Sequence, residues 1–193
     1  MARQVSKAKQ QLLRIGFVPI AEMKIFPYVL PNLRLQHPDL TIELSSLNNA
    51  EQLKALKRGE LDITFTRDNT ENDEIQSQFV LTEPLIFPAA EQSNTLHNTI
   101  LEFTKTHGID LNIVQKADSI LLNINSIGSG LGCTILPAYV APLGVSNTVV
   151  RPLDVELPSL DLFVSYRKNT ESVGVKRFID QLNKVFHLDK NLD

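Results

Sequence analysis

The stretch LRIGFVP at Leu13–Pro19 decides the fold, because it predicts a buried strand that passes directly into a helix. The chain is mainly apolar from Leu12 to Val18, which is the length of a buried strand, and a proline ends such a strand. Over residues 21–36 apolar side chains then recur with a helical period. Pro27 and Pro31 fall inside this pattern, so the helix either begins near Pro27 or is kinked.

Two further strand patterns follow the first one at the spacing of a parallel sheet. Leu40–Leu44 alternates between apolar and polar residues, and Leu61–Phe65 is a short, mainly apolar run. Between these two strands, Asn48 or Asn49 predicts the start of a helix and Gly59 predicts its end. The order strand, helix, strand, helix, strand implies right-handed crossovers and a parallel sheet.

A second, smaller αβ unit is predicted between about Phe87 and Leu160. It contains the glycine-rich sequence IGSGLGCTILP at Ile127–Pro137, which has the pattern of a passage from a helix into a short strand closed by proline. The predicted elements of this unit are a helix at Asn98–Phe103, a strand at Leu111–Val114, a helix from Asp118 or Ser119 to Ser126 or beyond, and a strand at Cys133–Leu136.

The chain then returns to the first unit. Leu162–Tyr166 has the composition of a strand, and Val173–Phe186 is an amphipathic helix. A chain that leaves one αβ unit, builds a second and returns predicts an α/β fold with two lobes and a cleft between them.

Composition excludes several classes of protein. The 193 residues carry a formal charge of −3, which argues against a surface built throughout for nucleic acid. No apolar run is long enough to span a bilayer, and the polar N-terminus lacks the apolar centre of a signal peptide. The single cysteine excludes an internal disulfide. These features predict a cytoplasmic protein with no membrane partner.

Three stretches taken together resemble the effector-binding domain of LysR-type transcriptional regulators. They are LRIGFVP at Leu13–Pro19, ALKRGELDITF at Ala55–Phe65 and IGSGLGCTILP at Ile127–Pro137. Their order and spacing carry the resemblance, which extends from Leu13 to about Val185.

Within that family, three shorter motifs are most similar to the activators that sense 3-phenylpropionate and cinnamate. The motifs are GFVPIAE at Gly16–Glu22, RGELD at Arg58–Asp62 and NIVQ at Asn112–Gln115. This narrower resemblance implies that the ligand is a small aromatic carboxylate.

The resemblance implies two Rossmann-like lobes joined by two crossing strands, as in the periplasmic-binding-protein type II fold, with a small ligand in the cleft. Residues 1–12 resemble the end of the linker helix that follows the family's winged helix-turn-helix, which is absent, so a fragment is expected. Residues 13–86 and 162–193 form the first lobe, and 87–161 form the second. Compared with the family pattern, the second lobe is short after Phe87. Either the protein is shortened there, or a piece is absent from this sequence.

The predicted ligand site lies where strands of an αβ lobe end and helices begin, because helix N-termini there attract anions. By resemblance, Ile20, Asn49 and Ala89 match effector contacts. Two alternatives stay open, namely that Asn49 is only a helix cap and that Arg67 is a solvated surface residue. The predicted ligand-binding residues are Pro19, Ile20, Ala21, Asn48, Asn49, Arg67, Phe87, Pro88 and Ala89.

No enzymatic chemistry is predicted. Cys133 has no basic neighbour in sequence and is expected to be a buried, inert thiol. The four histidines lack metal-ligand spacing, and the glycine-rich segment precedes a strand, which is the wrong context for a dinucleotide. We therefore expect no metal and no cofactor.

The sequence is thus interpreted as the effector-sensing domain of a LysR-type regulator. A solute-binding protein of the same architecture and a small enzyme that uses the same cleft are the alternatives. The resemblance also implies a homodimer, a tetramer in the full-length protein, and DNA binding only through the missing N-terminal domain. Candidate dimer contacts, each of which could equally be core, are Tyr28, Leu35, Leu121 and Leu122.

Overall fold

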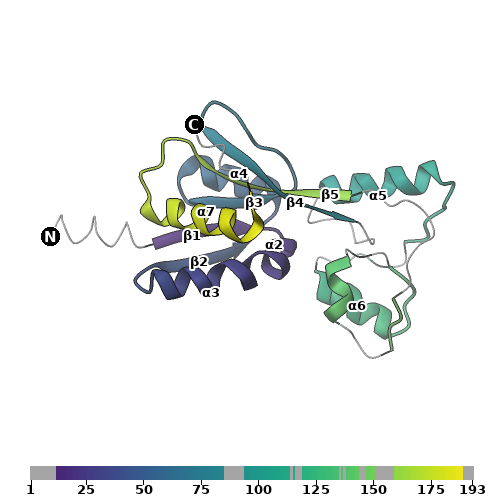
Figure 1. Cartoon of the computed structure of the whole chain (residues 1–193). Coiled ribbons are helices and arrows are strands. Elements are labelled where there is room, and N and C mark those ends of the chain that lie inside the picture. Colours follow the sequence, from purple (N-terminus) through teal and green to yellow (C-terminus); the bar gives the residue numbers. More distant parts are fainter. Residues whose placement is uncertain are drawn as a thin grey trace. The chain divides into compact units, whose positions relative to one another are not determined.

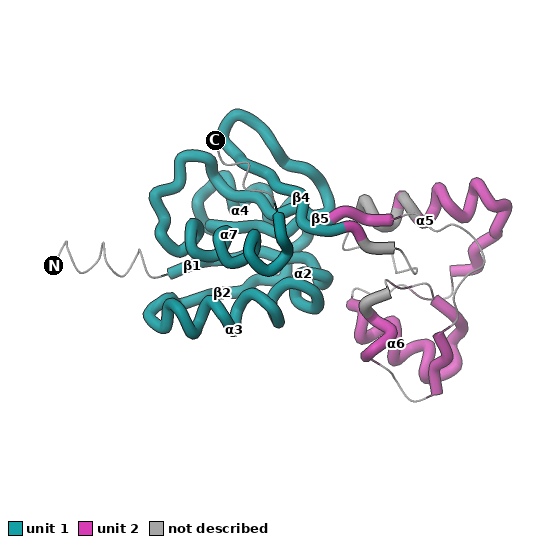
Figure 2. Tube along the Cα trace, in the orientation of Figure 1, with its two compact units in different colours: residues 1–81, 162–193 teal, residues 82–161 magenta. Residues whose placement is uncertain are grey.

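The chain divides into two compact units in a computed structural model (Figures 1 and 2). Unit 1 contains residues 1–81 and 162–193, and unit 2 contains residues 82–161. The structure describes residues 12–84, 94–113, 115, 119–134, 136, 138–143, 147–150 and 159–188.

Unit 1 is built on a sheet with the strand order β2-β1-β3-β5-β4. Strand β1 pairs in parallel with β2 and with β3, which confirms the predicted parallel arrangement. Strand β5, the returning strand, pairs antiparallel with β3, so the sheet is mixed. The strands are β1 at Leu12–Phe17, β2 at Thr41–Ser46, β3 at Ile63–Thr66, β4 at Ile75–Pro84 and β5 at Ser159–Arg167.

Helices cover both faces of this sheet (Figure 1). Alternate residues of β1 face opposite ways, as expected for a strand. Leu13 lies against Gly174 on the face that carries α3 and α7, and Gly16 lies against Gln52 on the face that carries α4. The helices of unit 1 are α2 at Pro19–Lys24, α3 at Phe26–Gln36, α4 at Asn49–Arg58 and α7 at Val173–Phe186.

A row of phenylalanines forms the centre of the core on the α3 and α7 face. Phe17 of β1 contacts Phe26 of α3 with 5.1 Å between ring centroids, and Phe26 contacts Phe65 of β3 at 5.8 Å. Phe65 in turn contacts Phe178 of α7 at 6.0 Å. All three pairs are edge-to-face, the arrangement that the quadrupoles of the rings favour. One row of rings therefore joins four elements that are distant in sequence.

The two prolines in the first helical pattern are accommodated by a break in the helix. Helix α2 ends at Lys24, and α3 begins at Phe26 with Pro27 in its first turn, where a missing N–H costs nothing. The prediction that a helix begins near Pro27 is confirmed. Pro31 lies inside α3 and is exposed to solvent.

Unit 2 contains helices α5 at Asn94–Thr106 and α6 at Ile120–Gly128 and a 3₁₀ segment, η1, at Ala138–Leu143. The predicted cap at Ser119 is confirmed, because its hydroxyl accepts a hydrogen bond from the N–H of Leu122 at 3.1 Å. The two strands predicted in this unit are wrong. The described residues of Leu111–Val114 and Cys133–Leu136 form no strand.

The physical reason is that a short apolar run becomes a strand only when a neighbouring strand satisfies its N–H and C=O groups. No described strand pairs with either run. Leu111 and Ile113 are instead 44% and 57% exposed, and Cys133, expected to be buried, is exposed as well.

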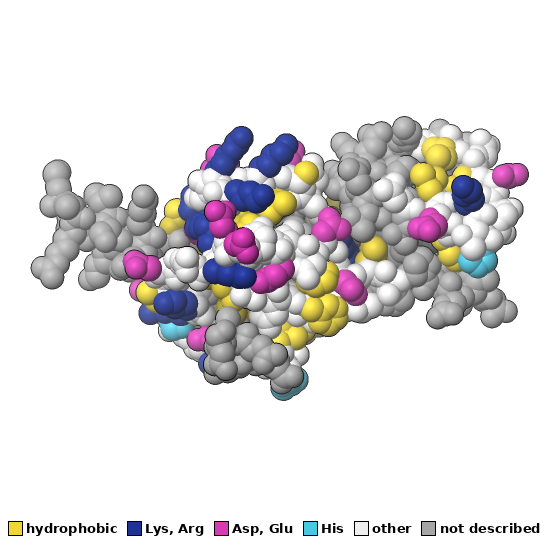
Figure 3. Space-filling view, turned by 90° about the horizontal axis from the view of Figure 1, so that it is seen from above, with side chains coloured by type: hydrophobic (Ala, Val, Ile, Leu, Met, Phe, Trp, Pro, Cys, Tyr) yellow, Lys and Arg dark blue, Asp and Glu magenta, His cyan; other side chains and the backbone are white. Residues whose placement is uncertain are grey.

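Charged side chains of both signs are mixed over the face of unit 1 seen in Figure 3. Lys54, Lys57 and Arg58 are exposed, as expected for a solvated face of α4. This mixture agrees with the small net charge and shows no continuous basic surface on the described residues in that view.

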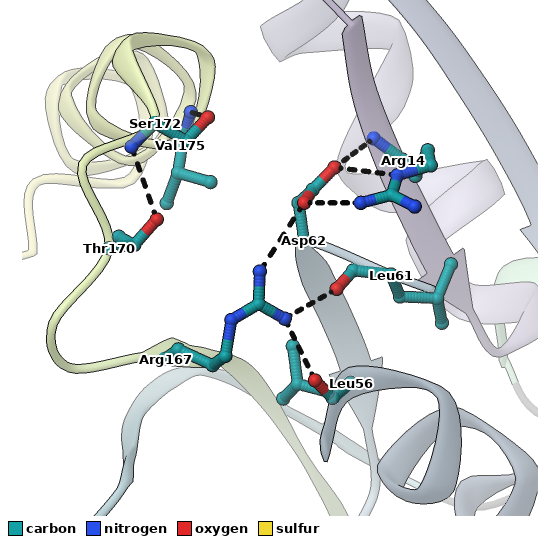
Figure 4. A network of polar contacts seen from close by, with 8 residues as sticks. All are labelled: Arg14, Leu56, Leu61, Asp62, Arg167, Thr170, Ser172 and Val175. Atoms are coloured by element: carbon teal, nitrogen blue, oxygen red, sulfur yellow. Dashed lines mark hydrogen bonds and ion pairs between the residues drawn. The ribbon is translucent and has the colours of Figure 1, made fainter. Parts of the chain in front are cut away.

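A buried carboxylate joins β1, β3 and β5 at the end of the sheet where β1 and β3 begin (Figure 4). Asp62 accepts hydrogen bonds from the backbone N, Nε and Nη2 of Arg14 at 2.9, 3.1 and 2.9 Å, and Nη2 of Arg167 lies 3.5 Å away. The hydrogen bonds that the Arg14 guanidinium donates to the Asp62 carboxylate raise the pKa of Arg14. Nη1 of Arg167 also donates to the carbonyls of Leu56 and Leu61. Arg167 therefore bonds one carbonyl near the C-terminal end of α4 and one in the segment between α4 and β3.

Removing this carboxylate should destabilise unit 1. Because Asp62→Ala removes the acceptor of the half-buried Arg14 guanidinium and of Nη2 of Arg167, we expect the free energy of unfolding to fall by about 2–4 kcal/mol. Urea denaturation followed by circular dichroism measures the change. Glu60→Ala is the matched control, because its ion pair with Arg58 is long, at 4.0 Å, and exposed, and it should change stability by less than about 0.5 kcal/mol. Equal effects of the two substitutions would contradict the structural role of Asp62.

Candidate ligand-binding site

Three loops meet at the edge of the sheet where the parallel strands end. Strands β2, β1 and β3 are neighbours, so Phe17, Ser46 and Thr66, their last residues, lie along one edge. The N–H of Leu47 donates to the carbonyl of Phe17 at 3.2 Å, and the N–H of Val18 donates to that of Phe65 at 3.3 Å. Ligands of doubly wound folds bind outside such carboxyl ends.

Gln52 on α4 ties these loops together. Its side chain is fully buried, Nε2 donates to the carbonyl of Leu47 at 2.9 Å, and Oε1 accepts from the N–H of Phe65 at 3.1 Å. The glycine at position 16 provides room for it, because a Cβ there would lie 3.1 Å from Cγ of Gln52 and 2.5 Å from Cδ1 of Leu61. Gln52 is not among the site residues predicted from the sequence, although a glutamine in line with the apolar stripe of α4 is a signal for a buried polar contact.

Asn48, and not Asn49, is the cap of α4. Oδ1 of Asn48 accepts from the N–H of Glu51 at 2.9 Å, and the Glu51 carboxylate accepts from the N–H of Asn48 at 3.2 Å, which is a capping box. The alternative that Asn49 is only a helix cap is therefore wrong. No described residue accepts a hydrogen bond from the N–H of Asn49 or Ala50 at this N-terminus.

Asn49 makes contacts that sequence reasoning did not foresee. Its Nδ2 donates to Oδ2 of Asp68 at 2.8 Å, and its Oδ1 accepts from the N–H of Arg67 at 3.4 Å. Asp68 is held in turn, because its carbonyl accepts from the hydroxyl of buried Thr66 at 2.9 Å. Asn49 was expected to contact a ligand through its amide, and the structure shows that this amide also binds Asp68.

Arg67 is a buried residue, only 8% exposed. The alternative that it is a solvated surface arginine is therefore wrong. Arg67 follows the last residue of β3, and its backbone N–H donates to Oδ1 of Asn49.

Of the other predicted ligand contacts, Pro19, Ile20 and Ala21 form the first turn of α2 after β1. Ile20 and Ala21 are 1% and 0% exposed, so their side chains contribute to packing, whereas Pro19 is partly exposed. The N–H of Ala21 donates to the carbonyl of Val18 at 2.9 Å and is already satisfied. Phe87, Pro88 and Ala89 lie outside the described residues.

The described residues contain no group of three or more His, Cys, Asp or Glu side chains that could hold a metal ion. None of the helices in that part of the chain has the length and hydrophobicity needed to cross a bilayer.

Comparison with known families decides what kind of domain this is. Residues 6–187 match the model of the LysR substrate binding domain. The chain belongs to that family. Two transcriptional regulators are among its relatives. The Hca operon transcriptional activator HcaR of Escherichia coli K12 is 30% identical over 92% of this chain and 69% of its own length. CatR of Pseudomonas putida is 26% identical over 72% of this chain and 56% of its own length.

Solved structures of this LysR family have the same fold. The BenM effector-binding domain with its effector benzoate superposes with a TM-score of 0.76, at 18% identity, and the match covers 91% of this chain and 92% of that one. Full-length CbnR in complex with its target DNA gives a TM-score of 0.74 at 16% identity, over 95% of this chain and 74% of that one. The predicted α/β fold of the periplasmic-binding-protein type II kind is thus confirmed. The alignment with HcaR extends over 204 positions, so HcaR has residues at positions where this chain of 193 residues has none.

Gln52 should be essential for the geometry of this edge of the LysR domain. Because Gln52→Leu leaves the buried N–H of Phe65 and carbonyl of Leu47 without partners, we expect the free energy of unfolding to fall by about 2–5 kcal/mol. Chemical denaturation measures the change. Lys54→Leu introduces the same residue on the exposed face of α4 and serves as the control. A stability of Gln52→Leu within about 0.5 kcal/mol of that of Lys54→Leu would show that Gln52 does not carry this role.

Proposed function

We propose that this chain senses a small aromatic carboxylate for a LysR-type transcriptional regulator, and that the carboxylate binds at the carboxyl edge of the sheet of unit 1. The observation that carries the proposal is the adjacency of Asn49 and buried Arg67 to the N-terminus of α4. Each of these groups favours an anion, and no metal or cofactor is needed to bind one.

The electrostatics of this corner support the choice of an anion. Helix α4 has ten residues, and no described residue accepts from the N–H groups of Asn49 and Ala50 at its positive end, where we propose that the anion binds. An arginine guanidinium at a low-exposure position binds a carboxylate more strongly than a solvated one does, because water screens it less. Asn48 supports the corner as the cap of the helix and is not itself required to touch the ligand.

Apolar residues near this edge and the similarity to known regulators support the proposal that the ligand has an apolar body. Pro19 is partly exposed next to this edge, and Phe87, Pro88 and Ala89 are predicted to add apolar surface. A solved relative of the same fold, BenM, has benzoate as its effector, and HcaR, which the motifs resemble, is 30% identical to this chain. The position of the ligand between two lobes stays a prediction from family resemblance.

In the intact protein, we propose, the ligand changes the balance between two arrangements of the regulator and thereby its action on DNA through an N-terminal domain. Such a ligand acts only through a difference in its affinity for the two arrangements. The relatives are transcriptional regulators, which favours this function over a solute-binding protein or an enzyme. A regulator of this kind acts in the cytoplasm.

A charge requirement is the sharpest test of the ligand class. We expect benzoate, 3-phenylpropionate or cinnamate to bind in isothermal titration calorimetry, and the matching amide to bind at least about 10-fold more weakly because it gives only neutral hydrogen bonds. Arg67→Gln should weaken binding of the acid about 10–100-fold and leave the amide almost unchanged. Arg58→Gln, at an exposed position of α4, is the control, and circular dichroism checks folding. Equal affinities for acid and amide would refute the anion site.

We further propose that the chain forms a homodimer in which α3 of one protomer packs on α6 of its partner, and that the full-length protein is a tetramer. All four predicted contact residues have large apolar side chains that the structure leaves exposed, which argues against the alternative that they are core. Two such equivalent contacts form a closed, symmetric interface. The exposed fractions are 58% for Tyr28, 81% for Leu35, 63% for Leu121 and 44% for Leu122.

Charge placed in this interface should separate the protomers. We expect the wild-type chain to sediment as a dimer at micromolar concentration and Leu35→Asp to sediment as a monomer, because a desolvated carboxylate is strongly unfavourable at a packed contact. Leu101→Asp, at an exposed leucine of α5, is the control and should remain dimeric. Analytical ultracentrifugation distinguishes these states. A monomeric wild type, or dissociation by both variants alike, would contradict the α3–α6 interface.

A further inference from the structure

We propose that Asp68 is a positioning residue that fixes the side-chain amide of Asn49 and lowers the affinity of this corner for anions. The inference rests on the ligand site proposed above and assigns its specificity to a residue that makes no predicted ligand contact. Three observations carry it: the contacts of Asn49, the support of the Asp68 backbone, and the sign of the charges on either side of Asn49.

The contacts of Asn49 select one orientation of its amide. Nδ2 donates to the Asp68 carboxylate at 2.8 Å, and Oδ1 accepts from the N–H of Arg67 at 3.4 Å. The flipped amide would place Oδ1 against a carboxylate and the NH₂ group against an N–H, so both contacts would become repulsive. One N–H of Asn49 is therefore directed to Asp68, and the second N–H of the same group is the donor that a ligand can use.

The backbone of Asp68 is itself held by a hydrogen bond. Its carbonyl accepts from the hydroxyl of Thr66, which is completely buried, at 2.9 Å. The Asp68 residue is exposed, whereas its backbone carbonyl is bound by a buried hydroxyl. A charged acceptor makes a stronger hydrogen bond to Asn49 than a neutral one does.

The two residues that contact Asn49 carry opposite charges, and Arg67 contacts it through its backbone N–H whereas Asp68 contacts it through its carboxylate. Arg67 attracts a ligand carboxylate, and Asp68 repels it, so the affinity for an anion is set by the balance of the two. The role of Asp68 thus has two separable parts, because Asp68→Asn keeps an acceptor for Nδ2 and removes the charge, whereas Asp68→Ala removes both.

The test uses the whole chain and benzoate or 3-phenylpropionate as the probe in isothermal titration calorimetry. Asp68→Asn should bind the acid as tightly as wild type or up to about 10-fold more tightly, because a like charge is removed. Asp68→Ala should bind at least about 5-fold more weakly than Asp68→Asn, because Asn49 loses its fixed orientation. The same pair of substitutions at Asp73, an exposed aspartate of the same loop, is the control for charge alone.

Repeating the Asp68 substitutions in the Asn49→Ala variant distinguishes a role that acts through Asn49 from a purely structural role of Asp68. There, Asp68→Ala and Asp68→Asn should have equal affinities, because the difference between them acts through Asn49. Equal affinities of the two variants in the wild-type background, or a difference that persists without Asn49, would overturn the proposal.

A measurement without ligand tests the positioning role of Asp68 separately from the proposed function. In ¹⁵N–¹H spectra, the side-chain N–H signals of Asn49 should shift markedly in Asp68→Ala, which removes the acceptor of Nδ2, and less in Asp68→Asn, which keeps a neutral acceptor. Unchanged signals in Asp68→Ala would refute the positioning role. Failure of every aromatic acid to bind the wild type would refute the proposed ligand class, and the spectra would still decide the role of Asp68.

Discussion

The buried amide of Gln52 is the contact on which the carboxyl edge of the sheet depends. It donates to the loop after β2 and accepts from β3, and the absence of a side chain at Gly16 of β1 provides its space. In a protein interior such an amide is stable only when its donor and its acceptor are both paired. Gln52 consequently fixes the segment that leads into α4 at Asn49 and the end of β3 that leads into Arg67.

Helix α4 is joined to the sheet by polar contacts at both of its ends, and this gives the two edges of unit 1 different characters. At one edge Arg167 bonds the carbonyl of Leu56 in α4, and the carboxylate of Asp62 accepts from both Arg167 and Arg14. At the other edge the helix begins with its capping box, and Asn49 links it to the loop after β3. The first edge stabilises the fold, and the second combines stability with groups that can bind.

Unit 1 could be predicted from sequence because its signals are local. A strand closed by Pro19, a helix stopped by Gly59 and an amphipathic helix at Val173–Phe186 are all present in the structure. The pairing of Asn49 with Asp68 could not be predicted, because a side-chain contact across 19 positions leaves no pattern in the sequence. The strands expected at Leu111 and Cys133 failed for a related reason, since an apolar run does not reveal whether a partner strand exists.

Unit 2 is an insertion within unit 1, and this determines how the sheet is completed. Strands β1, β2 and β3 follow one another closely in the chain, whereas β5 reaches β3 only after the whole of unit 2, with Ile63 opposite Tyr166. Closing so long a loop costs conformational entropy before any contact forms, although the cost grows only slowly with loop length. Local contacts form faster than distant ones, so we expect the first three strands to assemble before β5 and α7 dock. In that order of folding, the row of phenylalanines from Phe17 to Phe178 is completed only when α7 docks.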